Sequence, residues 1–146
     1  MKKVFMVKGV TTPEDYLKNM LDCIGENGEL NIAREIDEVA FCTAESEETA
    51  THIEKVNLDT SLADYDSVYS FYENALSNLD LFIAENSPEC NDKPYRNRML
   101  TFAKRIKRCY EINVPDFFLT IQKCMFIDSV LLYKTHAVGE LIENKK

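Results

Sequence analysis

Residues Pro115 to Lys146 read PDFFLTIQKCMFIDSVLLYKTHAVGELIENKK and contain the most apolar part of this 146-residue chain. Between Phe117 and Tyr133, apolar residues occupy nearly every side of a helical projection, whereas a surface helix would show one apolar stripe. A helix that is apolar all round is normally surrounded by other elements. The stretch therefore predicts the central helix of a bundle, with Gly139 loosening its final turns.

Two amphipathic segments precede this stretch and are expected to pack around it. Residues 60–86 carry apolar side chains at alternating steps of three and four, which predicts one long helix capped by Thr60 or Ser61. Its apolar positions are Leu62, Tyr65, Tyr69, Tyr72, Leu76, Leu79 and Ile83. The next segment, KPYRNRMLTFAKRIKRCY from Lys93 to Tyr110, shows the same spacing with a proline in its first turn, so a second helix is expected.

The N-terminal part predicts shorter elements. Thr12, Pro13 and Asp15 form a helix-start signature, in which Thr12 is the N-cap. The preceding KVFMV suits a short strand by its β-branched and aromatic residues. Residues 31–59 contain helix formers and an apolar stripe, which favours two further helices, although EVAFCTA taken alone would suit a strand.

Together these patterns predict a mainly α-helical single domain spanning residues 1–146. It would be a helical bundle of about five or six helices, and a short β element near the N-terminus stays open. The length fits one domain of about 100–150 residues, and 45% hydrophobic residues can supply a core. No run approaches the roughly 18 apolar residues of a membrane span. The five cysteines contain no CxxC, so we expect free thiols and a cytoplasmic protein.

The residues that carry most enzyme chemistry show no recognised arrangement. There is no Gly-rich phosphate loop, no Gly-x-Ser-x-Gly, and no cluster of Cys and His with zinc spacing. We therefore expect a protein without a metal, a cofactor or a catalytic site. His52 and His136 each have a glutamate four residues away, Glu48 and Glu140, and ordinary surface pairs are the preferred interpretation.

Asp128 lies in the apolar run MFIDSVLL and is the most unusual ionisable residue. A carboxylate in such a place must be exposed at an edge, paired or protonated. We expect it to be partly buried and bonded to an Arg or Lys of the basic segment, or to a Tyr hydroxyl. A small enzyme that uses Asp128, His52 or His136 is the weaker alternative.

Charge is sharply divided along the chain, whose formal net charge is −8. Residues 14–92 contain twenty acidic and three basic residues, whereas residues 93–110 contain seven basic residues and no acidic one. Such asymmetry bears on partners and association rates. The simplest explanation is that the basic helix packs beside acidic segments of its own chain.

The favoured function is a non-catalytic protein-binding module, of inhibitor, immunity-type or adaptor kind, that engages a basic partner. The densest acidic run supplies the candidate partner-binding residues: Glu35, Asp37, Glu38, Glu45, Glu47 and Glu48. A homodimer through Tyr65, Tyr69 and Tyr72 is a further hypothesis, although a core position is preferred for that seam. No membrane partner is expected.

The alternative function is binding of nucleic acid or a phosphate ligand through the basic helix, residues 93–110. Aromatic residues in the same helix could stack on bases. The candidate phosphate-binding residues are Arg96, Arg98, Lys104, Arg105, Lys107 and Arg108. Nucleic acid is the less favoured partner because the rest of the chain is acidic and repels it.

Overall fold

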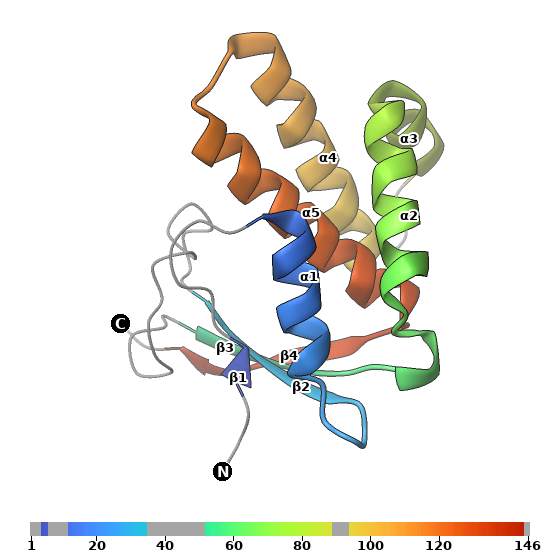
Figure 1. Cartoon of the computed structure of the whole chain (residues 1–146), viewed down its shortest axis with the longest axis vertical. Helices are drawn as coiled ribbons and strands as arrows, with labels where there is room; N and C mark the ends of the chain where they lie inside the picture. Colours follow the sequence, from blue (N-terminus) through green and yellow to red (C-terminus); the bar gives the residue numbers. More distant parts are fainter. Residues whose placement is uncertain (1–3, 6–11, 35–51, 89–93, 145–146) are drawn as a thin grey trace.

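The computed structural model describes residues 4–5, 12–34, 52–88 and 94–144, in which helices lie above one face of a sheet (Figure 1). The strands are β1 (Val4–Phe5), β2 (Glu29–Arg34), β3 (His52–Asn57) and β4 (Val138–Asn144). The helices are α1 (Pro13–Asp22), α2 (Tyr65–Ser77), α3 (Leu79–Asn86), α4 (Pro94–Ile112) and α5 (Asp116–Lys134). A short 3₁₀ turn, η2 (Thr60–Leu62), precedes α2. The prediction of a mainly helical fold with about five helices is confirmed.

The sheet has four strands in the order β1-β2-β3-β4. It is therefore larger than the short β element near the N-terminus that the sequence suggested as an option. Strand β1 is that element and pairs parallel with β2, while β2, β3 and β4 pair antiparallel. Leu30, Ile32 and Val56 are buried and join the core beneath the helices. On the other face, Lys55 and Glu29 form an ion pair at 3.4 Å.

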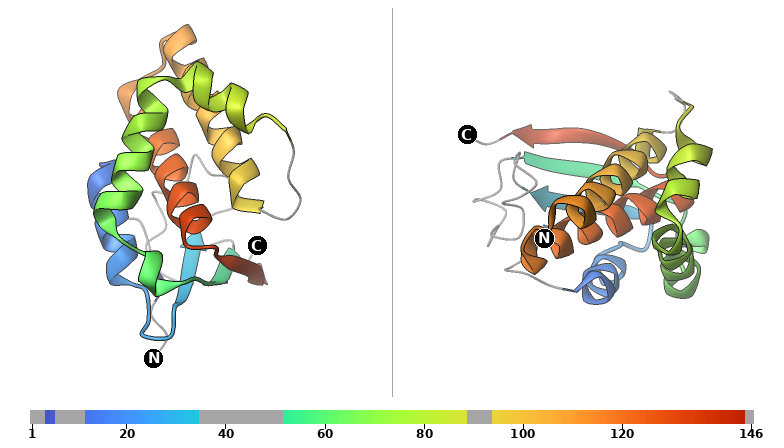
Figure 2. Two further views of the ribbon diagram at one scale, coloured as in Figure 1. Left: turned by 90° about the vertical axis from the view of Figure 1, so that its right-hand side faces the viewer. Right: turned by 90° about the horizontal axis from the view of Figure 1, so that it is seen from above.

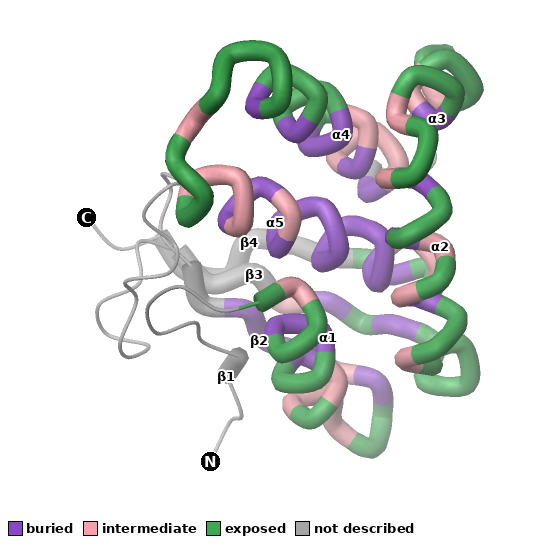
Figure 3. Tube along the Cα trace, turned by 45° about the horizontal axis from the view of Figure 1, so that its top comes forward, coloured by how far each residue is buried: buried purple, intermediate pink, exposed green. Residues whose placement is uncertain are grey.

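Helix α5 is the central helix that its composition predicts. Eleven of its residues between Ile121 and Leu132 are buried, and its tube is mostly purple in Figure 3. Seen from the side, α5 lies between α2 and α4 (Figure 2). The Phe126 ring contacts Tyr72 on α2 and Phe82 on α3, with ring centroids 5.9 and 5.6 Å apart. The core therefore forms between α5 and the elements around it.

The expectation of helices across residues 31–59 is wrong where the structure describes this region. Residues 31–34 belong to β2 and 52–57 to β3, and the two strands pair along their whole length. Leu30 and Ile32, two positions apart, both join the hydrophobic core, as alternate residues of a strand do, and the polar Asn31 between them is also buried. Ala, Arg and Glu favour helix, but the differences in helix propensity are worth less than about 1 kcal/mol per residue. Pairing with a strand distant in sequence outweighs them here.

Two helix boundaries also differ from expectation. The helix of residues 116–134 does not continue to Gly139, because His136 adopts a positive φ of 53° and the chain enters β4. Residues 60–86 form η2, α2 and α3 in place of one helix. Asp64 caps α2 through Ser67, and Asn78 interrupts the run and caps α3. The three-four spacing locates the apolar face, but it does not reveal these breaks.

None of the helices in the described residues combines the length and apolarity that a bilayer crossing requires.

Candidate functional site

Helices α1 and α2 lie side by side (Figure 1). We call the exposed carboxylates of these two helices and of the N-cap of α2 the acidic face, which comprises Glu14, Asp15, Asp22, Asp64, Asp66 and Glu73. Local helix chemistry explains part of it, because acidic residues in a first turn favour the positive end of the helix dipole. Thr12 caps α1 with an Oγ1 that accepts from the Asp15 amide at 3.2 Å, as the sequence predicts.

Tyrosines from α2 join the two helices of the acidic face. The Tyr65 and Tyr69 rings stack with centroids 5.5 Å apart, and Tyr69 donates a hydrogen bond to Glu14 Oε1 at 2.9 Å. The Lys18 ammonium lies 5.5 Å from the centre of the Tyr65 ring. Tyr65 and Tyr69 are half-buried and Tyr72 is buried, so the preferred core position of the seam is confirmed for Tyr72.

The Tyr69 and Tyr72 phenols stay neutral at physiological pH. Burial, and next the hydrogen bond to Glu14, raise the pKa of Tyr69 to about 12. Burial likewise raises the pKa of Tyr72. Neutral phenols keep their protons for donation and add no charge to the acidic face.

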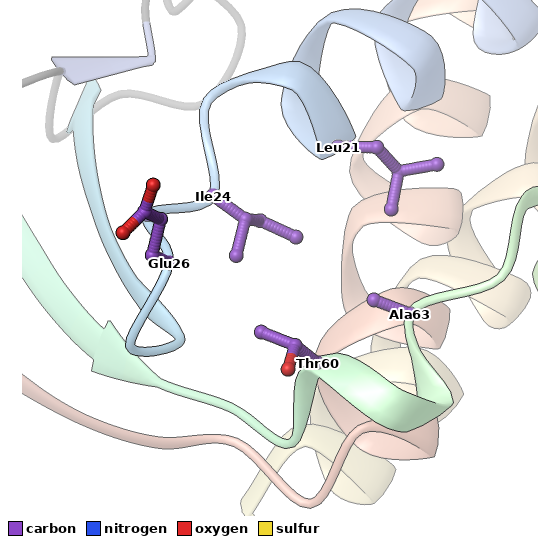
Figure 4. A pocket seen from close by; sticks show the side chains of 6 residues that line it. Leu21, Ile24, Glu26, Thr60 and Ala63 are labelled. Atoms are coloured by element: carbon purple, nitrogen blue, oxygen red, sulfur yellow. The ribbon is translucent and has the colours of Figure 1, made fainter.

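A hollow of about 300 Å³ opens where α1 ends near η2 (Figure 4). It is lined by Leu21, Ile24, Gly25, Glu26, Thr60 and Ala63. Figure 4 shows the Ile24 side chain directed between Leu21, Thr60 and Ala63, with Glu26 to one side. The loop beneath needs Gly28, whose φ of 83° and close approach to a carbonyl oxygen leave no room for a Cβ.

Carboxylates flank the lining residues of this hollow in the chain. Asp22, Asp59 and Asp64 are exposed and directly adjoin lining residues in the chain. Hydrogen bonds from the Ser61 hydroxyl and amide lower the pKa of Asp59, which keeps it ionised. Leu21, Ile24 and Ala63 offer apolar contact and Glu26 a negative charge, which suits a side chain that has an aliphatic stem and a cationic head.

The six acidic residues predicted to bind a partner lie outside the described residues. Glu35, Asp37, Glu38, Glu45, Glu47 and Glu48 all fall between β2 and β3. The acidic face on α1 and α2 is a different set. Four of its acidic residues, Glu14, Asp15, Asp64 and Asp66, lie at the starts of α1 and α2, and that feature could have identified them from sequence.

Helix α4 carries the predicted phosphate-binding residues, and several of them have partners within the fold. Lys107 Nζ lies 2.7 Å from Asp80 Oδ1, a hydrogen bond that raises the pKa of Lys107. Arg96 Nη1 donates to the Pro88 carbonyl oxygen at 2.8 Å. Arg108 Nη1 lies 3.8 Å from Glu111 Oε1. These contacts agree with a basic helix that partly neutralises its own chain.

Arg98 and Tyr16 both bind Asp128, as the sequence predicts, although Asp128 is fully buried and not partly buried as expected. Arg98 Nη1 lies 3.2 Å from Asp128 Oδ2 and donates to Ser129 Oγ at 2.8 Å. The Tyr16 hydroxyl donates to the same Asp128 oxygen at 3.4 Å. Because these residues come from α1, α4 and α5, the cluster ties three helices together.

The histidines do not form the helical pairs expected from sequence. His136 stands exposed after α5, and Glu140 belongs to β4, so the two do not share a helix face. His52 starts β3, whereas Glu48 lies outside the described residues. In the ranges that the structure describes, no three His, Cys, Asp or Glu residues gather as metal ligands.

No protein-family model, curated protein or solved structure matches this chain. A functional proposal must therefore come from the chemistry of the chain's own surfaces.

Proposed function

We propose that this chain is a non-catalytic protein-binding module, of inhibitor, immunity-type or adaptor kind. Its partner is a basic protein, and the acidic face of α1 and α2 contacts that partner. The observation that carries the proposal is the concentration of six exposed carboxylates on two adjacent helices. The cation among them, Lys18, lies over the Tyr65 ring and offsets little of that charge.

Electrostatics would act first in such an encounter. A surface of one sign attracts a partner of the opposite sign and raises the association rate constant, from about 10⁶ toward 10⁸ M⁻¹s⁻¹ at low salt. The residues between β2 and β3 in the sequence add six more carboxylates to the negative charge of the chain. Both contributions weaken when salt screens the charges.

Specific contacts would follow at the tyrosines and at the hollow. Tyrosine is enriched in protein interfaces because its ring is apolar and its hydroxyl is polar. The hollow beside Glu26 would receive an arginine or lysine side chain of the partner, and arginine is among the residues that contribute most to interface affinity. Placement in the cytoplasm is part of the proposal, since a free thiol such as Cys109 suits a reducing compartment.

The test is affinity capture from the cell's own lysate after nuclease treatment, with two charge-matched variants. The face variant combines Asp15→Asn, Asp66→Asn and Glu73→Gln. The control variant combines Glu29→Gln, Asp80→Asn and Glu85→Gln, which are acidic residues outside the face. We expect wild type and control to capture the same basic protein and the face variant to lose it. Equal capture by both variants would refute the proposal.

Phosphate binding by α4 is the second candidate function, because Lys104, Arg105 and Arg108 remain exposed on this helix. Neutralising these three residues should then abolish binding of a single-stranded oligonucleotide at low salt, measured by fluorescence anisotropy. No binding by wild type would remove this candidate. The enzyme alternative has less support, since Arg98 and Tyr16 already engage the Asp128 carboxylate.

A further inference from the structure

Large apolar side chains are exposed where α4 turns into α5. Tyr110, Ile112 and Phe117 are 56%, 51% and 53% exposed, and they fall within eight consecutive residues. Asn113, at a positive φ of 57°, closes α4 between them. We call residues 107–117 together with Lys123 the helical tip, which lies at the end of the helical layer far from the sheet (Figure 1).

This exposure exceeds what isolated surface residues require. Half-exposed aromatic rings leave on the order of 100 Å² each in water, so Tyr110 and Phe117 alone expose roughly 200 Å². The largest apolar patch on a soluble monomer covers about 300–600 Å² and is often functional, and with Ile112 added the exposed area here approaches the lower end of that range. A standard interface covers about 800 Å² on each partner, with an apolar centre and a polar rim. The helical tip has the composition of such a centre.

The charges around these residues identify the occupant. Arg108 and Lys123 are positive, while Glu111 and Asp116 are negative, so both signs border the apolar residues. Lys123 Nζ lies 5.8 Å from the Tyr110 ring centre, and the Arg108–Glu111 contact of 3.8 Å is long. In a two-fold contact each surface meets a copy of itself. A surface of mixed sign can satisfy that condition, whereas the acidic face would repel its own copy.

We propose that the helical tip is a homodimer interface and that its occupant is a second copy of this chain. Tyr110, Ile112 and Phe117 form the apolar centre in both copies. Arg108 and Lys123 of one copy lie near the partner's Glu111 and the partner's Asp116. This interface differs from the tyrosine seam, through which a homodimer was one hypothesis from the sequence. Tyr72 of that seam already packs on Phe126 within the chain.

The dimer has a consequence for binding. The acidic face lies on α1 and α2, so pairing through α4 and α5 leaves both acidic faces open. A dimer would then bind a partner with two sites more tightly than either copy alone. The dimer itself does not depend on the function proposed for the acidic face.

Sedimentation velocity of the full chain, at protein concentrations up to about 100 µM, tests the proposal. This concentration is about 100-fold above the dissociation constant of a dimer with a Kd of about 1 µM. The tip variant combines Tyr110→Ser, Ile112→Ser and Phe117→Ser. Its control, Leu62→Ser with Val138→Ser, removes exposed apolar side chains elsewhere. Circular dichroism verifies that each variant folds. We expect twice the monomer mass for wild type and control, and the monomer mass for the tip variant.

A charge variant tests the self-complementary arrangement separately. Arg108→Glu with Lys123→Glu leaves every apolar residue in place but gives this region four acidic residues, so it should repel its copy. We expect a dimer dissociation constant at least 10-fold higher. A monomeric wild type, or a dimer that both the tip and charge variants retain, would overturn the proposal.

Discussion

Replacing Arg98 with methionine should destabilise the protein strongly, because it removes a cation from a buried carboxylate. Asp128 is fully buried, and Arg98 Nη1 lies 3.2 Å from its Oδ2. Breaking such a pair by deleting one partner costs about 3–5 kcal/mol. The Arg98 side chain is 21% exposed, so water offsets part of the loss and we expect the lower end, about 3 kcal/mol.

Urea unfolding measures this loss. With an m-value of about 2 kcal/mol per M urea, a loss of 3 kcal/mol moves the unfolding midpoint by about 1.5 M. Lys104→Met is the matched control on the same helix, since its side chain is exposed and most surface substitutions change stability by less than about 0.5 kcal/mol. An unchanged m-value would show that both states keep their compactness.

A double variant separates the ion pair from the rest of Arg98. Arg98 also donates to Ser129 Oγ at 2.8 Å and lies over the Phe102 ring, and both contacts are lost in any variant. Arg98→Met with Asp128→Leu removes both charges, so it should recover about 2 kcal/mol of the single-variant loss. An Arg98→Met loss below about 1 kcal/mol would refute this account of the cluster. A double variant less stable than the single one would also refute it.

Three further predictions concern other parts of the fold. Burial raises the pKa of Tyr72 above its unfolded value near 10, so its contribution to stability is complete below that pH and declines above it. Tyr72→Phe should remove up to about 1.4 kcal/mol per pH unit of that decline. Urea unfolding midpoints from pH 9 to 11.5 measure it, and an unchanged dependence of the midpoint on pH would contradict the prediction. Gly28→Ala should lower the free energy of unfolding by more than about 1 kcal/mol, because a Cβ at φ 83° collides with a backbone carbonyl. Gly25→Ala, where the added Cβ meets its nearest oxygen at 3.3 Å, is the milder control, and equal losses would refute the reasoning. Thr12→Ala should cost about 1 kcal/mol in thermal or urea unfolding by removing the cap of the Asp15 amide, while Thr12→Ser should restore most of it.

Local pattern was sufficient for the helices that pack on one another. Apolar residues on every side of 117–133 identified the central helix, and the Thr12 cap located the start of α1. The interpretation of Asp128 also succeeded, because a buried carboxylate needs a donor whichever fold surrounds it. These conclusions depend on contacts between near neighbours in the chain or on the chemistry of one side chain.

The sheet shows where such reasoning ends. Residues 31–34 and 52–57 become strands through pairing with each other, and 138–144 through pairing with β3. A strand has no internal hydrogen bonds, so its stability depends on a partner that is distant in sequence. Helix propensity within a short window contains no information about that partner.

The sequence by itself determined the helical class, the central helix and the division of charge along the chain. Only the tertiary structure decided which charges lie together. It set α1 beside α2, so carboxylates about fifty residues apart in the sequence lie on adjacent helices. It also paired Lys107 with Asp80 and Arg98 with Asp128. Tyr110 and Phe117, by contrast, are left exposed at the helical tip. The reason is that proximity across the fold follows from packing of the core, whereas composition and spacing describe one segment at a time.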